Sequence, residues 1–137
     1  MAIPNGGGGY QVGDGNLNEP LIDALPDPVS VTTAATLTPA QVLNGLILAN
    51  SGITASVNYT LPTVADLELV LSNSDKVGTA FSFRLVNLGT SSGTAIIATN
   101  TGWTITGSLT MTVPVTTGAQ FVARKSAAGA WTLYRVV

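Results

Sequence analysis

The second half of the chain is a series of short apolar segments separated by glycine-containing turns, and this pattern restricts the fold more than any other feature. In FSFRLVNLG, the side chains of Phe81, Phe83 and Leu85 alternate with those of the intervening residues, as in a strand with one buried face. The segments TAIIATN, WTITGSLTMTVPV, AQFVARKS and WTLYRVV follow, and SAAGA between the last two predicts a hairpin loop. Short strands at intervals of roughly 8–12 residues are typical of sandwiches and barrels.

The region before this series predicts further strands and a first short helix. VSVTTAATLT, LILAN and NYTLPT each have the composition and patterning of a strand. Thr38 followed by Pro39 is a typical helix start, because threonine caps the helix and proline fits its first position. PAQVLNG therefore predicts a single helical turn that ends at Gly45.

TVADLELVLSNS predicts a second helix. Thr63, with Asp66 three residues later, resembles a capping box, and a helix of two or three turns is expected to follow. On this helix we expect Leu67, Val70 and Leu71 to share one face. The elements together predict a mainly β domain, a β-sandwich or barrel-like (β-tulip-like) fold with one or two short helices.

Residues 1–28 differ in composition from the rest of the chain. They contain four acidic residues, no basic residue, four prolines and a glycine cluster, a mixture that sustains neither a helix nor a central strand. Apolar side chains such as Tyr10 and Leu21 are present as well. We therefore predict an extended N-terminal arm over residues 1–28 and a β-rich domain over residues 29–137. Composition leaves open whether the arm docks on a partner or packs on its own domain.

The chain carries unusually little charge. Charged residues make up 9% of it, against roughly a quarter in an ordinary soluble domain. Such a surface belongs either to a stable neutral domain or to one covered by other copies or a partner, because interspersed charge discourages association. The net charge of −2 and the five basic residues argue against nucleic acid, which requires clustered Lys and Arg. We expect the adjacent Arg124 and Lys125 to form a solvated strand end.

Membrane association is not expected either. The longest apolar run, VLNGLILA at residues 42–49, is too short to span a bilayer and contains Asn44 and Gly45. The first residues, MAIPNGGGG, have neither the basic nor the apolar region of a secretory signal. We therefore expect synthesis in the cytoplasm.

Catalytic chemistry has few candidates in this sequence. The chain contains no His and no Cys, which removes the commonest general base and the thiol nucleophile. A serine nucleophile would have to rely on Lys76 or Lys125. Asp66 and Glu68 are two residues apart on the predicted helix, so their carboxylates diverge rather than pair. We predict that the protein is not an enzyme and binds no cofactor.

The glycine-rich run GGGGYQVGDGN, residues 6–16, fails the templates for nucleotide loops. Val12 or Asn18 stands where a dinucleotide-binding loop needs its third glycine. Asp14 stands where a P-loop needs lysine, and its carboxylate repels phosphate. The run therefore predicts no phosphate site.

The same run contains part of a calcium-loop pattern. Asp14, Asn16 and Asn18 match the first three ligands of an EF-hand-type loop. Glu19 and Leu25, however, replace the glycine of its sharp turn and its bidentate glutamate. Because Asp-Gly and Asn favour tight turns, we predict a turn here and no metal site.

Four aromatic residues, Tyr59, Trp103, Trp131 and Tyr134, have two alternative interpretations. They could form a sugar-stacking platform, or they could belong to the core. Aromatic side chains on alternating strands are more often core, and we favour that interpretation. WTLY places Trp131 on one face of its strand and Tyr134 on the other.

Several of these segments together resemble the head decoration (capsid cement) proteins of tailed bacteriophages. The likeness covers nearly the whole chain and runs through YQVGDGN, ATLTPAQVLNGLILAN, NYTLPT, VGTAFSFRLVNLGTSSGTAIIATNTGWTITG and GAQFVARKSAAGAWTLYRV. LTPAQVLNGLIL, NYTLP and WTLYRV carry most of it. These are matches of hydrophobic pattern, so the resemblance transfers no active site.

The resemblance implies a structural virion protein that binds the outer surface of the assembled head and stabilises the capsid. Its partner would be the major capsid protein, and it would act as a homotrimer whose arms reach over neighbouring capsid subunits. It would be located on the outer capsid surface after synthesis in the host cytoplasm. The arm residues expected to contact the capsid are Tyr10, Val12, Asp14, Asn16, Leu17, Asn18, Leu21 and Ile22. The alternative is a phage tail or fibre module, or a carbohydrate-binding β-module that uses exposed aromatics.

Overall fold

The computed structural model describes residues 24–49, 55–71, 76–90, 92–106 and 111–137. In these ranges the chain forms ten strands and two helices, which confirms the predicted mainly β fold. In chain order they are β1 (Val29–Val31), β2 (Ala35–Thr36), α1 (Pro39–Leu43), β3 (Leu46–Ala49), β4 (Val57–Thr60), α2 (Val64–Val70), β5 (Ala80–Asn87), β6 (Ala95–Ala98), β7 (Trp103–Thr106), β8 (Thr112–Val113), β9 (Gly118–Ala127) and β10 (Ala130–Arg135).

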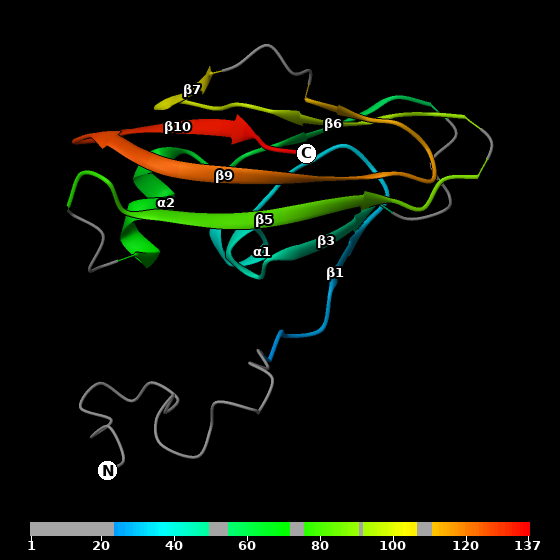
Figure 1. Ribbon diagram of the computed structural model, residues 1–137, viewed down its shortest axis with the longest axis horizontal. Coiled ribbons are helices and arrows are strands. Elements are labelled where there is room, and N and C mark those ends of the chain that lie inside the picture. Colours follow the sequence, from blue (N-terminus) through cyan, green and yellow to red (C-terminus); the bar gives the residue numbers. More distant parts are fainter. Residues whose placement is uncertain (1–23, 50–54, 72–75, 91, 107–110) are drawn as a thin grey trace, which may run out of the picture.

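The strands form two sheets (Figure 1). The larger sheet has the order β1-β3-β5-β9-β10-β7, and the smaller has the order β2-β4-β6-β8. From β1 to β9 the chain alternates between the sheets, so only β9 and β10 follow each other within one sheet. Strands β1, β3 and β5 are mutually parallel, and so are β2, β4 and β6. Parallel neighbours are possible because a strand of the opposite sheet returns the chain between them.

The alternation between sheets corrects one prediction. VSVTTAATLT, expected as one strand, forms β1 in the larger sheet and β2 in the smaller one. At the crossing, the Tyr59 hydroxyl donates to the carbonyls of Val31 and Thr32, each at 3.4 Å. WTITGSLTMTVPV likewise supplies β7 to the larger sheet and β8 to the smaller. A chain that changes layers after every strand keeps its strands short.

Side chains from both sheets meet in one hydrophobic core. Phe83 and Leu85 of β5 are fully buried, as the alternation of the sequence predicts. Phe121 of β9 stacks on Phe83 with the ring centroids 5.2 Å apart. Tyr59 and Ile97 reach the same core from the smaller sheet. Full burial of one such side chain stabilises the fold by about 1.5–3 kcal/mol.

Helix α1 begins and ends where the sequence predicts. The Thr38 Oγ1 accepts from the Gln41 backbone N–H at 3.2 Å, and the Gln41 Oε1 accepts from the Thr38 backbone N–H at 2.9 Å. This reciprocal capping box satisfies two backbone donors at the helix start. Gly45 follows with φ +95°, which ends the helix.

Helix α2 also has the predicted start, but one of its side chains faces away from the core. The Thr63 Oγ1 accepts from the Asp66 backbone N–H at 3.1 Å. Leu67 is fully buried, whereas Val70 is exposed, which contradicts the prediction for that residue. Residues on a helix turn by about 100° each, so Val70 lies about 60° from Leu67 on the side away from Leu71. No helix in the described parts of the chain is long and apolar enough to cross a bilayer.

The C-terminal hairpin confirms the predicted loop. Strand β9 ends at Ala127 and β10 begins at Ala130, with Gly129 between them at φ +67°. A two-residue turn of this kind favours glycine, since positive φ costs a residue with a Cβ atom about 1 kcal/mol or more.

Candidate functional site

The eight arm residues predicted to contact a capsid lie before Ala24, outside the described residues. The predicted turn at Asp14 lies outside them as well. The structure therefore describes the root of the arm, Ala24–Pro28, and the surface of the β domain.

The root of the arm is attached at the junction between α1 and β3. The Asn44 Nδ2 donates to the carbonyl of Asp27 at 2.9 Å. Leu25 lies beside Gly45, with its Cδ2 3.7 Å from the point where a Cβ would stand. All five root residues are exposed, and Figure 1 shows this blue segment leading beyond the β1 edge of the larger sheet. The described part of the arm, Ala24–Pro28, thus leaves the domain at a sheet edge.

The larger sheet has one face that neither helix covers, and Figure 1 looks onto this face. We call it the outer face and define it by side chains that alternate with the core residues of β5, β9 and β10. They are Arg84, Val86, Gln120, Val122, Arg124 and Tyr134. Each is exposed or half-buried. The six strands of this sheet contain no Asp or Glu, so their charge on this face is positive.

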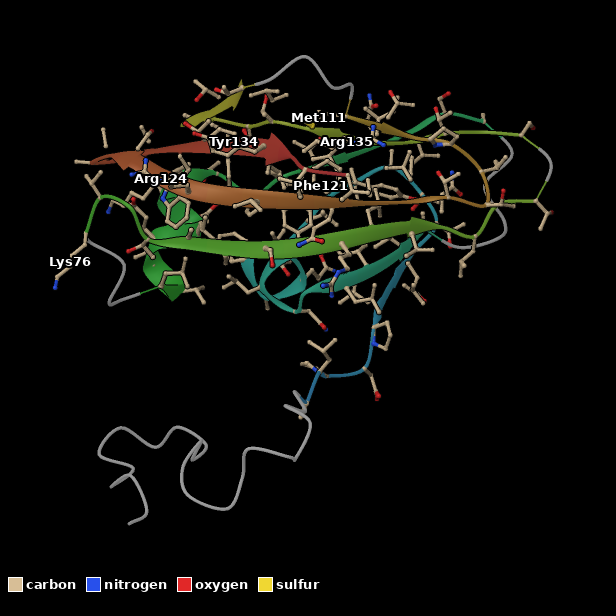
Figure 2. All side chains as sticks on the ribbon, viewed as in Figure 1. Lys76, Met111, Phe121, Arg124, Tyr134 and Arg135 are labelled. Atoms are coloured by element: carbon tan, nitrogen blue, oxygen red, sulfur yellow. The ribbon has the colours of Figure 1, made fainter. Side chains whose placement is uncertain are left out.

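Arg84 and Arg124 stand at the two ends of a row on the outer face, in which Val122 is the apolar member beside Ser82 and Gln120. Arg84 is in register with Gln120, and Arg124 lies four residues further along β9. Strand geometry then separates the two Cα atoms by about 14 Å. Midway between them, Val122 is in register with Tyr134, and Figure 2 shows Arg124 and Tyr134 on these neighbouring strands. Among the described residues, neither guanidinium has an ion-pair partner.

An open depression adjoins Arg84 on the outer face. It has a volume of about 240 Å³ and is lined by Arg84, Val86, Gly118, Gln120 and Val137, together with Ala119. Its lining is mostly apolar and includes the guanidinium of Arg84 and the amide of Gln120. This depression can accept an aliphatic side chain and a carboxylate, and no sequence pattern indicated it.

On the opposite face of the same sheet, Lys125 forms an ion pair with Glu68 of α2. The Lys125 Nζ lies 3.0 Å from the Glu68 Oε1, and the side chain of Lys125 is only 6% exposed. The Trp131 Nε1 donates to the same carboxylate oxygen at 3.1 Å. The expected solvated strand end is therefore wrong for Lys125, whereas Arg124 is exposed. Period-two alternation explains this, since Lys125 shares the inward face of Phe121.

These contacts change the acidity of Glu68. The hydrogen bond from Lys125, supported by the one from Trp131, holds the pKa of the Glu68 carboxyl below its usual range, although burial opposes this shift. The Lys125 ammonium is held against this carboxylate. Asp66, by contrast, accepts a hydrogen bond from the Thr63 hydroxyl at 2.7 Å. The two carboxylates of α2 diverge as predicted.

The four aromatic candidates are divided by burial. Tyr59 and Trp131 are fully buried and Trp103 nearly so, as the core interpretation predicts. The Trp103 Nε1 donates to the Pro62 carbonyl at 2.7 Å. Tyr134 is half-buried on the outer face. The four residues therefore form no common stacking platform.

Apolar side chains are also exposed on α2 and shortly before β5. Leu69 is 80% exposed, and Val70 and Val77 are exposed by more than half. The sequence predicted that Val70 shares the face of Leu67 and did not single out the other two. The helix has one inward stripe, so Leu69 and Val70 remain in contact with solvent.

The described residues contain no group of three or more His, Cys, Asp or Glu side chains that could hold a metal ion. No protein-family model, no curated protein and no solved structure matches this chain. We therefore infer a function from the surface of the domain and the composition of the arm.

Proposed function

We propose that this chain is a decoration protein that binds the outer surface of an assembled phage head and stabilises the capsid. It acts as a trimer on the major capsid protein, and its N-terminal arm reaches over neighbouring capsid subunits. The protein is not an enzyme, and its location is the outer surface of the virion. One observation carries this proposal. An arm that contains apolar side chains among glycines is joined at a sheet edge to a small domain of low charge.

The root of the arm supports this role. The Asn44–Asp27 hydrogen bond fixes where the arm starts, and the exposed root directs it away from its own core. The arm carries apolar side chains such as Tyr10 and Val12 among glycines, which allow the backbone to lie close to another surface. An attached arm that leaves its own domain is suited to a second binding surface.

Stabilisation of the head would follow from mass action. A ligand that binds only the intact shell lowers the free energy of that state by its own binding free energy. Trimerisation adds to this effect, because the first bound arm raises the effective concentration of the other two at the shell. The low charge of the chain favours such coverage, since few charged groups would have to lose water.

The test uses heads assembled without this chain by the phage that encodes it. The full chain should co-sediment with these heads, appear by electron microscopy at regular positions on their outer surface, and raise the temperature at which they release DNA. A chain lacking residues 2–23 should keep its fold and lose most of this binding. Leu69→Ser, a matched change on the exposed body, should bind as the full chain does.

Each other outcome has a defined meaning. Full-chain protein that leaves heads undecorated contradicts the decoration function, and density on the tail supports the fibre alternative instead. Undiminished binding by the truncated chain contradicts the role of the arm alone. A carbohydrate-binding module remains the weaker alternative, because three of its four candidate aromatics are buried.

A further inference from the structure

Charge is distributed very unevenly between the two parts of the chain. Residues 1–28 carry four acidic residues and no basic one, a formal charge of −4. Residues 29–137 carry all five basic residues and three acidic ones, a formal charge of +2, and together these give the net −2 of the chain. The arm and the domain therefore attract each other electrostatically.

The outer face is the described surface that matches an acidic segment. It presents Arg84 and Arg124, and its six strands contain no acidic residue. Neither Arg has an ion-pair partner among the residues that the structure describes. Between them lies Val122, flanked by Ser82 and Gln120, and the open depression adjoins Arg84.

We propose that the outer face binds residues 19–23 of the arm of a second copy of this chain. The sequence there is Glu-Pro-Leu-Ile-Asp. In an extended segment Glu19, Leu21 and Asp23 point to one side, and the two acidic residues are about 13 Å apart. The two arginines are about 14 Å apart by the same strand geometry. Both carboxylates therefore reach a guanidinium while Leu21 covers the row between them.

Pro20 favours this way of binding over the addition of a strand to the sheet edge. Proline has no backbone N–H and cannot complete a strand ladder, but it lies readily on the face of a sheet. It also biases the residue before it, Glu19, toward extended backbone. The preferred local conformation is thus the one in which the acidic side chains have the required spacing.

The exposed root allows the arm to reach a second copy. Ala24–Pro28 leads beyond the β1 edge of its own sheet (Figure 1). The hydrogen bond from Asn44 to the Asp27 carbonyl holds this direction. A contact from the arm of one copy to the face of the next is heterologous, and it closes into a ring when the rotation permits.

This inference does not depend on what the assembled protein binds. Of the arm residues expected to contact a capsid, Leu21 would be covered by the second copy, whereas residues 10–18 precede the docked segment and remain available for a capsid surface. Self-association is measured on the purified chain in solution, whereas decoration is measured on heads. Failure of one proposal is therefore distinguishable from failure of the other.

The test uses three charge-reversed forms of the full chain in sedimentation velocity experiments. The face-reversed form carries Arg84→Glu and Arg124→Glu, and the arm-reversed form carries Glu19→Arg and Asp23→Arg. The third form combines all four changes. Each two-site form should self-associate about tenfold or more weakly than the unaltered chain, because two attractive pairs become repulsive. The combined form should recover association, and high salt should weaken it in both associating chains.

A mixture of the two reversed forms decides between docking within a chain and between chains. The acidic face of one form then meets the basic arm of the other, so the mixture should associate although each form alone does not. Lys76→Glu and Asp14→Arg serve as controls outside the contact and should leave association within about twofold of the unaltered chain. All forms should keep the circular dichroism spectrum of the unaltered chain.

Three results would overturn the proposal. The first is an unaltered chain that stays monomeric at every concentration. The second is a mixture that stays monomeric, which shows that a face and an arm of opposite charge do not bind each other between chains. The third is association that is unchanged by both reversals. Because the arm-reversed form alters no residue of the folded domain, its result stands even if the face-reversed form does not fold.

Discussion

The Nζ of Lys125 and the Oε1 of Glu68 are 3.0 Å apart, and this ion pair joins β9 to α2 beneath the larger sheet. The two partners differ in exposure, since the Lys125 side chain is 6% exposed and that of Glu68 is 27% exposed. Water can hydrate the carboxylate more easily than the ammonium. The pair is therefore more sensitive to loss of Glu68 than to loss of Lys125.

Glu68→Gln should lower the free energy of unfolding by about 1–3 kcal/mol, because it removes the carboxylate that faces a buried ammonium. Lys125→Met should cost less, since it removes the charge that is harder to hydrate and keeps most of the apolar stem. Urea unfolding at neutral pH measures both changes. Asp66→Asn on the same helix is the control and should cost a few tenths of a kcal/mol. A larger cost for Lys125→Met than for Glu68→Gln would contradict this account.

The same pair predicts a dependence of stability on acid pH. The pKa of Glu68 is lowered in the folded state, so its stabilising contribution is complete above the unfolded-state pKa of about 4.5. It declines as the pH falls below that value and is lost once the pH has fallen through the folded-state pKa. The difference in unfolding free energy between the unaltered chain and Glu68→Gln should shrink over this interval. A difference that stays constant from neutral to strongly acid pH would show that Glu68 does not act through its charge.

Gly102 and Gly129 offer a matched pair of glycine substitutions. Both have positive φ, but a Cβ at Gly102 would stand 2.6 Å from the Val64 Cβ, whereas one at Gly129 meets nothing within 4 Å. Gly129→Ala should cost about 1 kcal/mol from backbone strain alone. Gly102→Ala should cost about 2–4 kcal/mol, because it adds overpacking at the start of α2. Thermal unfolding measures the difference, and equal costs would place the start of α2 further from this turn.

Asn87 is a buried polar residue whose side-chain hydrogen bonds should contribute to the free energy of unfolding. Its Nδ2 donates to the Val113 carbonyl at 3.0 Å, and its Oδ1 accepts from the Gly89 backbone N–H at 2.9 Å. These bonds link the end of β5 to β8 of the opposite sheet. Asn87→Leu should lower the free energy of unfolding by about 2–4 kcal/mol, since two buried backbone groups lose their partner. Asn58→Leu at an exposed position should change it by less than about 0.5 kcal/mol.

Local features of this protein could be predicted because they depend on neighbours in the sequence. Thr38 and Thr63 cap their helices through residues three positions later. Phe83 and Leu85 face the core because side chains in a strand alternate. The position of Val70 could not be obtained in this way, since two nearly equivalent stripes exist on a seven-residue helix. The packed core selected the one that includes Val64 together with Leu67.

The sequence predicted the arm but not the surface that we propose to receive it. The acidic, apolar character of the arm is a property of composition, and it predicted a segment that docks either on a partner or on its own domain. The receiving surface is a property of register, because Arg84 and Arg124 come from strands that are far apart in the sequence. The inward position of Lys125 had a signal in the alternation with Phe121, but its partner Glu68 had none.

By itself, the sequence determined that this protein is a mainly β domain with two capped helices, an acidic arm and a body of few charges. These properties follow from side-chain periodicity, capping chemistry and composition, all of which act over a few residues. Only the tertiary structure decided that the strands alternate between two sheets and that Arg84 and Arg124 share an open face. It also decided that Glu68 meets Lys125. These contacts join residues distant in the chain, so they are set by packing of the whole core rather than by any local preference.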